Sequence, residues 1–329
     1  MQPGPRNLIT DVPGILVGQA EAPALMSGTT VILADPAAVA AADVRGGGPG
    51  TREIAAIGPD ALNEVAHAVV LSGGSAYGLA AADGVMEWLR DRGRGLAVGG
   101  SVVPIVPAAI LFDLPQGQNP SAPGMPLPYR DLGIRAAAAA GPDFALGSHG
   151  AGLGATTADA RGGIGSASIT WQGLTVGAIV AVNALGSTLI PGSRAFLAAP
   201  FEIGDEFGAV PLPPRPPAPH AVPAKPHVVP GTNTTIACVA TDAALTRSQA
   251  QRLAIMAQDG IARAIHPAHT PFDGDTVFAL ATGRGRAVDA VGLYMLGALA
   301  ASCLARAIAR AVFHATGPGA WSTLKDPAS

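Results

Sequence analysis

The sequence predicts an α/β protein, because apolar segments of strand length alternate along the chain with longer segments of helical pattern. The 329 residues are 49% hydrophobic and only 13% charged, and they include 43 Gly and 30 Pro. This composition is typical of a compact globular protein with many tight turns. The length suffices for one large domain or two modest ones, and we expect a single domain over residues 1–329.

The predicted strands are short and apolar, and turn-forming residues such as Gly and Pro separate them. Strands are expected at residues 8–10, 15–19, 28–34, 67–71, 166–171, 174–182 and 235–241, and helices at about residues 76–92, 130–140, 246–264 and 288–314. The uncharged run at residues 290–305 is too short to span a membrane, and Arg306 follows it on the same helix. We therefore interpret it as a buried helix and expect no membrane association.

The charge and cysteine content narrow the possible classes of protein. The net charge is −3, and no Lys/Arg cluster with interleaved aromatic residues occurs, so we expect no nucleic-acid partner. Cys238 and Cys303 lie in apolar segments and are expected to be buried thiols in a reducing compartment. The first residues contain no apolar signal region, which favours a cytoplasmic protein.

The most informative stretch is residues 231–242, where proline-rich sequence gives way to an apolar strand. Residues 211–230 contain nine prolines and are interpreted as an extended or mobile linker. Asn233 and Thr234 lie at the boundary. If the bond before Thr234 were cut, its hydroxyl could act as a nucleophile and its new α-amino group as the general base. Taken alone, however, the stretch is more typical of a turn that enters a strand.

Two glycine-containing turns have both a functional and a structural interpretation. Residues 43–53 could cradle an anion or substrate, but they lack the Gly-Lys-Ser/Thr ending of a phosphate loop, so the favoured interpretation is a turn in which the glycines allow positive φ or close packing. Residues 72–79 resemble a nucleophile elbow with Ser75 as the candidate. Because the pattern is not Gly-x-Ser-x-Gly, we expect instead a rigid corner that presents Tyr77.

Polar residues also occur at the ends of predicted strands. Asn183 closes one strand and could be a turn residue or could direct its amide at a developing oxyanion. Asp273 and Asp275 flank a Gly before another strand, so their side chains point the same way in an extended chain. They could orient a threonine hydroxyl, bind a cation together with His266 and His269, or simply form a turn. We expect no metal and no cofactor.

Several of these segments, taken in order, resemble one known family. They are Asp-Val-Arg-Gly-Gly (43–47), Leu-Ser-Gly-Gly-Ser-Ala-Tyr-Gly-Leu (71–79), Val-Pro-Ile-Val-Pro-Ala-Ala-Ile-Leu-Phe-Asp (103–113), Gly-Gly-Ile-Gly-Ser-Ala-Ser (162–168), Asn-Thr-Thr-Ile (233–236), Val-Ala-Thr-Asp (239–242) and Asp-Gly-Asp-Thr-Val-Phe (273–278). The sequence resembles the self-processing L-aminopeptidase/D-esterase peptidases of serine peptidase family S58, also called P1 family peptidases. These include β-aminopeptidases and endo-type 6-aminohexanoate-oligomer (nylon oligomer) hydrolases. Each motif is weak by itself, but their joint order covers nearly the whole chain.

The resemblance implies a four-layer αββα sandwich like that of N-terminal-nucleophile hydrolases, with different connectivity. It also implies self-cleavage into an α chain of residues 1–233, which ends with the proline-rich 211–230 linker, and a β chain of residues 234–329. Relatives usually cut before Ser, and the Asn233-Thr234 pair matches the nylon-oligomer branch. The two fragments are expected to stay associated and to form a homo-oligomer, a tetramer of αβ units.

The same resemblance assigns roles to individual residues. Thr234 would be the nucleophile and Asn183 the oxyanion-stabilising residue, while Tyr77 would line the substrate pocket. Asp273 and Asp275 would orient the nucleophile. The implied function is that of an N-terminal-threonine amidohydrolase or aminopeptidase. Its substrates would be small peptides, β-peptides or 6-aminohexanoate oligomers.

One position departs from the family pattern. Many relatives carry a Gly-Lys pair shortly before the Gly-Gly-Ile-Gly-Ser motif, whereas this chain has Ala158 and Asp159 there. The work of the general base then rests more on the Thr234 amine. Two alternatives stay open: a non-catalytic scaffold or binding protein of the same fold, and a metal hydrolase that uses the Asp and His residues named above.

Overall fold

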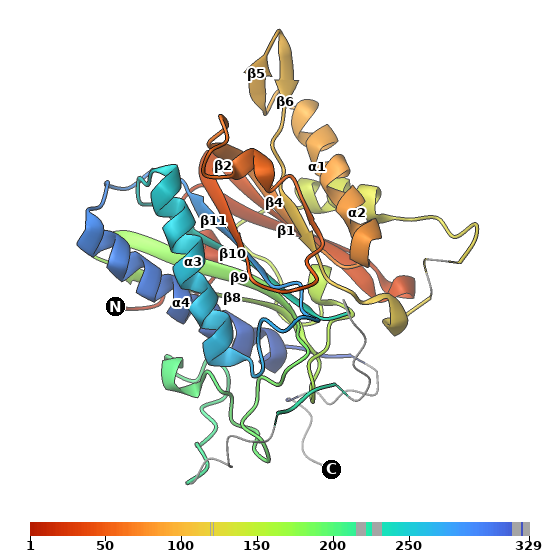
Figure 1. Cartoon of the computed structure of the whole chain (residues 1–329), viewed down its shortest axis with the longest axis vertical. Coiled ribbons are helices and arrows are strands. Elements are labelled where there is room, and N and C mark those ends of the chain that lie inside the picture. Colours follow the sequence, from red (N-terminus) through yellow and green to blue (C-terminus); the bar gives the residue numbers. More distant parts are fainter. Residues whose placement is uncertain (119, 121, 215–221, 226–231, 318–323, 325–329) are drawn as a thin grey trace.

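The computed structural model describes residues 1–118, 120, 122–214, 222–225, 232–317 and 324. Within these residues, nine strands form one mixed sheet, and helices cover both of its outer sides (Figure 1). The predicted α/β class is therefore confirmed.

The long strand β2 lies near the middle of the sheet. The strand order is β3 (Thr51–Arg52), β7 (Ala108–Ile110), β4 (Val65–Ser72), β2 (Ser27–Val44), β11 (Thr276–Ala281), β10 (Thr234–Thr241), β9 (Leu174–Asn183) and β8 (Gly163–Trp171), and β1 (Ile15–Ala22) also pairs with β2. Strands β5 (Leu96–Val98) and β6 (Ser101–Val103) form a separate hairpin that projects from one end of the molecule (Figure 1).

Strand β2 connects the two halves of the sheet. Its register with β4 shifts between Leu33 and Ala38. The part before this irregularity pairs with β1, and the part after it pairs with β11. The sequence predicted only residues 28–34, because Pro36 interrupts the pattern and the continuation is rich in alanine, which is depleted in strands. The predicted strand was therefore too short.

Alternating side chains along the strands build three apolar cores, as expected from the period of two in an extended chain. On β10, Ala237 and Val239 pack toward α3 and α4, whereas Ile236, Cys238 and Ala240 belong to the core between the two halves of the sheet. The third core lies between β2, β4 and the helices α1 and α2. The layers are thus helix, sheet, sheet and helix, which confirms the αββα sandwich.

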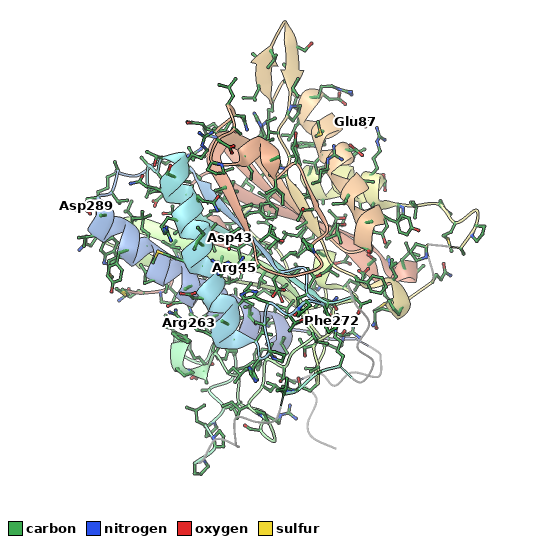
Figure 2. All side chains as sticks on the ribbon, in the orientation of Figure 1. Asp43, Arg45, Glu87, Arg263, Phe272 and Asp289 are labelled. Carbon is green, nitrogen blue, oxygen red and sulfur yellow. The ribbon has the colours of Figure 1, made fainter. Side chains whose placement is uncertain are left out.

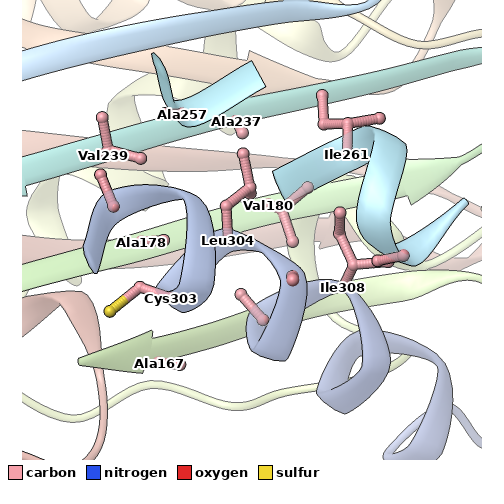
Figure 3. Packing of buried hydrophobic residues seen from close by; sticks show 14 of the residues in the cluster. Ala167, Ala178, Val180, Ala237, Val239, Ala257, Ile261, Cys303, Leu304 and Ile308 are labelled. Carbon is pink, nitrogen blue, oxygen red and sulfur yellow. The ribbon is translucent and has the colours of Figure 1, made fainter. Parts of the chain in front are cut away.

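Helices α3 (Arg247–Ala264) and α4 (Ala290–Phe313) begin close to the predicted positions. Each starts at a capping side chain: Thr246 accepts from Gln249 N, and Asp289 accepts from Gly292 N at 2.8 Å. Figure 3 shows Leu304 of α4 packed among side chains of both helices and of the strands beneath them.

Helix α4 is long and apolar enough to cross a membrane by length and composition, yet 67% of its most apolar stretch is buried inside the molecule. Its Arg306 is also buried, with Nε 2.5 Å from Oε1 of Glu206. These features are those of a core helix, as predicted.

Helices α1 (Ala81–Arg90) and α2 (Tyr129–Ala138) cover the other half of the sheet. The helix predicted from residue 76 is divided, because a 3-10 helix η4 (Ser75–Ala80) precedes α1. The other 3-10 helices are η1 (Ile9–Asp11), η2 (Pro23–Leu25), η3 (Ala55–Ile57), η5 (Leu114–Gln116), η6 (Gly150–Gly152) and η7 (Ala199–Phe201).

The strand predicted at residues 8–10 is wrong, since η1 occupies this segment. The Asp11 carboxylate accepts from the backbone N–H groups of Arg6 and Leu8, and such local bonds favour a turn over a strand. The predicted linker at residues 211–230 lies partly outside the described residues. Residues 211–214 and 222–225, which are described, form no helix or strand.

Candidate active site

Thr234 is the first residue of β10, a strand in the interior of the sheet. β10 pairs antiparallel with β9 and parallel with β11, and its register places Thr234 opposite Asn183, the last residue of β9. Both residues are buried, with 3% and 1% of their surface exposed. The fold thus brings together two of the predicted site residues, which are 51 positions apart in the sequence.

The peptide bond before Thr234 lies in a polar environment. The Thr234 hydroxyl donates to the carbonyl oxygen of Asn233, and the backbone N–H of Gly274 donates to the same oxygen at 2.9 Å. A Cβ built on Gly274 would come within 2.8 Å of Thr234 Oγ1, so the backbone of Gly274 lies directly against the hydroxyl. The carbonyl of this bond therefore has a backbone donor in the position where an oxyanion would need one.

The Asn183 amide is fully engaged. Its Nδ2 donates to the carbonyls of Phe112 at 2.9 Å and Thr232 at 3.2 Å. Its Oδ1 accepts from Thr156 N at 3.0 Å and from Lys225 Nζ at 3.3 Å. In the uncut chain Asn183 is therefore hydrogen-bonded to Thr232, two residues before Thr234.

Asp275 supports the start of β10. Its Oδ1 accepts from Thr235 N at 2.7 Å, and its Oδ2 accepts from His269 N at 3.0 Å and lies 2.9 Å from His269 Nδ1. The carboxylate thus connects the residue after the candidate nucleophile to the loop that precedes β11.

Asp273 holds a different part of the same loop. Its Oδ1 accepts from Leu185 N at 3.3 Å, and its Oδ2 accepts from the backbone N–H of Thr270 at 3.0 Å and from its hydroxyl at 2.5 Å. Burial, and next the nearby charge of Asp275, raise the pKa of Asp273. The two carboxylates flank Gly274 and fix the backbone whose N–H reaches the Asn233 carbonyl.

The glycine-rich loop, residues 43–53, packs against the loop that carries Asp273 and Asp275, here called the carboxylate loop. Gly46 N donates to Asp275 O at 3.2 Å, and Gly48 N donates to Asp273 O at 2.8 Å. A Cβ on Gly46 would lie 2.3 Å from Asp273 O, which only glycine avoids. The close-packing interpretation of residues 43–53 is therefore the better one. Figure 2 shows Asp43 and Arg45, at the end of β2, beside α3, where Gln258 donates to Asp43 O at 2.8 Å.

Tyr77 is connected to the site through Asp113. Tyr77 lies on η4 and is 40% exposed. Gly74, which precedes η4, donates its N–H to Asp113 Oδ1 at 2.7 Å, and Asp113 follows Phe112, whose carbonyl binds Asn183. Burial raises the pKa of Asp113 to about 7. The predicted corner at residues 72–79 is thus coupled to Asn183 by a buried acid that the sequence analysis did not single out.

The metal-hydrolase interpretation finds little support. His269 is bonded to Asp275, but the His266 side chain is exposed. Within the part of the chain that the structure describes, no three His, Cys, Asp or Glu side chains are grouped as a metal site requires.

Two further residues bear on the departure from the family pattern. Asp159 accepts from the Ser187 hydroxyl at 2.7 Å and thereby holds the loop after β9. Lys225, from the segment before the candidate cleavage site, donates to Asn183 and was missed by the sequence analysis. The signal was present in the composition, because the chain contains only two lysines, Lys225 and Lys325, among its 20 Lys and Arg residues.

Comparison with known proteins identifies the family and agrees with the fold. The sequence profile of peptidase family S58 matches residues 7–321. An uncharacterized aminopeptidase of Mycobacterium tuberculosis is 43% identical over 97% of both chains. A 6-aminohexanoate-oligomer endohydrolase of Paenarthrobacter ureafaciens is 27% identical over 94% of this chain and 86% of that protein.

Solved structures show the same architecture. A β-aminopeptidase of Burkholderia sp. superposes with a TM-score of 0.69 at 24% identity, covering 94% of this chain and 87% of that one. The L-aminopeptidase D-Ala-esterase/amidase of Ochrobactrum anthropi, described as a new variant of the N-terminal-nucleophile hydrolase fold, gives 0.68 at 20% identity, with 95% and 88% covered.

The protein is therefore a hydrolase of amide or peptide bonds, built on the N-terminal-nucleophile hydrolase type of sandwich. More particularly, the chain belongs to peptidase family S58.

Proposed function

We propose that the protein is a self-processing amidohydrolase that cuts its own Asn233–Thr234 bond and then uses Thr234 as the nucleophile for substrates. The observation that carries this proposal is the position of Thr234. Thr234 is the first residue of a buried interior strand, and its hydroxyl donates a hydrogen bond to the carbonyl oxygen of Asn233. The backbone N–H of Gly274 donates to the same oxygen. A nucleophile next to a carbonyl whose oxygen already has a donor is arranged for acyl transfer.

Turnover follows in two steps. Thr234 Oγ attacks the substrate carbonyl while the free α-amine of the cut chain takes the hydroxyl proton and passes it to the leaving amine. Water then releases the acyl group by the reverse sequence. Asn183 stabilises the oxyanion with its Nδ2, which is released from Thr232 when the cut lets the preceding segment move.

Burial of the nucleophile explains why processing must come first. Thr234 is 3% exposed in the uncut chain, so no substrate reaches it before the segment at residues 232–233 withdraws. Removal of that segment frees both the α-amine and the Asn183 amide.

The two fragments remain together after the cut. β10 lies between β9 of the N-terminal fragment and β11 of its own, and β11 pairs with β2 of the N-terminal fragment. Helices α3 and α4 bury the same core from the C-terminal fragment. Separation would expose this core, so the fragments behave as one folded unit. We also propose that these units form a homo-oligomer, namely a tetramer. We propose further that the protein is cytoplasmic.

The proposed substrates are short amides with a free amino terminus: small peptides, β-peptides or 6-aminohexanoate oligomers. Tyr77 is proposed to line their pocket, because it is partly exposed and its helix is held to Asn183 through Asp113 and Phe112.

The test is turnover of amino acid p-nitroanilides and of 6-aminohexanoate oligomers by the cut enzyme. Loss of one oxyanion donor should lower kcat about 10²–10³-fold in Asn183→Ala, whereas Asp205→Asn, a change on an exposed side chain, should keep wild-type turnover. Near-normal activity in Asn183→Ala would remove that residue from its role.

A further inference from the structure

Self-cleavage poses a chemical problem that turnover does not. Before the cut, the nitrogen of Thr234 belongs to the peptide bond with Asn233, and an amide nitrogen is not a base. The proton of the Thr234 hydroxyl must therefore go to another group while the new bond forms. The resemblance to the family implies a lysine where this chain has Asp159, and the Asp159 carboxylate accepts a hydrogen bond from Ser187.

Lys225 brings an amine to the Asn183 side chain, beside the candidate cleavage site. It precedes Thr234 by nine residues, and its Nζ lies 3.3 Å from Asn183 Oδ1. Asn183 is in turn the cross-strand partner of Thr234. Residues opposite each other in an antiparallel pair have Cβ atoms about 4.5–5.5 Å apart, so an amine bonded to the Asn183 side chain lies on the same face of the sheet as the Thr234 hydroxyl.

The surroundings of Lys225 favour a neutral amine. Burial lowers its pKa to about 7, while the charge of Asp273 acts in the opposite direction. The charge of Asp275 acts on Asp273, and the His269 side chain, which is 23% exposed, is hydrogen-bonded to Asp275. Arg161 pairs through its backbone with Thr156, whose N–H donates to Asn183. At neutral pH a large share of Lys225 can therefore accept a proton.

The acidic and imidazole side chains near the bond already have hydrogen-bond partners. Each oxygen of Asp273 accepts at least one hydrogen bond, from Leu185 or Thr270. His269 Nδ1 is directed at Asp275. The Asn183 amide holds Thr232 and Phe112 and so is not directed at the Asn233 carbonyl, whereas Gly274 N–H is.

We propose that self-cleavage uses its own pair of groups, with the Lys225 amine as the base and the Gly274 N–H as the oxyanion donor. This proposal rests on the proposed function. The Lys225 amine takes the hydroxyl proton as the bond from Thr234 Oγ to the Asn233 carbonyl carbon forms. Gly274 N–H stabilises the charge on the carbonyl oxygen.

The remaining steps return the proton. Collapse of the intermediate breaks the C–N bond, and the Lys225 ammonium gives its proton to the nitrogen, which becomes the free α-amine of Thr234. Water then hydrolyses the resulting ester to leave a carboxylate on Asn233 and the free hydroxyl on Thr234. Lys225 thus acts once per molecule, and the α-amine that it helps to release is the base in every later turnover.

The experiment follows the cleavage of full-length wild type, Lys225→Gln, Lys225→Arg and Lys225→Ala by intact mass from pH 5.5 to 9. The control is Lys325→Gln, which removes the other lysine of the chain. The wild-type rate should rise with pH and level off above about 7. Lys225→Gln should be cut about 10²–10⁴-fold more slowly, without that step in the pH profile. Lys325→Gln should match wild type.

Two variants distinguish a base from a structural contact. Added ethylamine should accelerate cleavage of Lys225→Ala, and Lys225→Arg should stay slow because a guanidinium does not deprotonate near neutral pH. Wild-type cleavage rates in Lys225→Gln or Lys225→Arg, or no response of Lys225→Ala to the amine, would overturn the proposal. Wild type that is not cut at Asn233–Thr234 would instead overturn the proposed function itself.

Discussion

The packing of the glycine-rich loop against the carboxylate loop gives a quantitative prediction for Gly46→Ala. An added Cβ would lie 2.3 Å from Asp273 O and 2.4 Å from Asp275 N, both of them backbone atoms. Neither atom can rotate away, so the two loops must separate by roughly 1 Å. Overpacking of this kind costs about 1–3 kcal/mol of folding free energy.

The larger effect should be on cleavage. Gly274 lies between Asp273 and Asp275, whose backbone atoms must shift. Its N–H must keep its hydrogen bond to the Asn233 carbonyl oxygen, which is 2.9 Å long in the wild type. A misplacement of roughly 1 Å at a reacting group can cost about 10²-fold in rate. We therefore expect Gly46→Ala to be cut about 10²-fold more slowly than wild type.

The assay is a time course of cleavage by intact mass, with the free energy of unfolding measured by urea in the uncut Thr234→Ala background. Gly141→Ala is the matched control, because a Cβ there meets no atom within 4 Å. Gly141→Ala should leave the free energy of unfolding unchanged to within about 0.5 kcal/mol and the cleavage rate unchanged to within about twofold. Cleavage of Gly46→Ala at the wild-type rate with unchanged stability would refute the role assigned to this packing.

Two further predictions concern buried titratable groups. The folded protein keeps a proton on Asp113 up to about pH 7, whereas the unfolded chain releases it near pH 4. The contribution of Asp113 to the free energy of unfolding therefore falls by up to about 1.4 kcal/mol per pH unit between these two values. Urea unfolding of Thr234→Ala with and without Asp113→Asn should show this slope only when Asp113 is present, and equal slopes in the two proteins would contradict the prediction. Burial also raises the pKa of Cys238 and of Cys303, so neither thiol should react with a disulfide reagent until urea unfolds the protein, and rapid labelling of the native protein would contradict their burial.

The parts of the fold that follow from local pattern could be predicted from the sequence. α3 and α4 begin directly after Thr246 and Asp289, residues whose short side chains cap a helix locally, and their apolar faces repeat at helical spacing. β10 could be predicted for the same reason, since its boundary is a change in composition. β2 could not, because its second half becomes a strand only through pairing with β11, and the pairing partner is invisible in the local sequence.

Part of the candidate site could likewise be predicted from the sequence, and part could not. Thr234, Asn183 and the two aspartates lie at strand ends and carry side-chain chemistry, so a sequence pattern can select them. The Gly274 N–H carries no such signature, because every residue except proline has one and only the fold directs it at Asn233. Lys225 lies in a proline-rich segment that has no hydrophobic periodicity. Its contact with Asn183, 42 positions away, could not be predicted from the local sequence.

The most direct test of Thr234 as the nucleophile is the intact mass of purified wild type after incubation at neutral pH, beside Thr234→Ala. We expect wild type to separate into a fragment of residues 1–233 and a fragment that starts at Thr234, while Thr234→Ala remains one chain of 32.5 kDa. A single mass of 32.5 kDa for both proteins, or the same cut in Thr234→Ala, would contradict the assignment of Thr234 as the nucleophile.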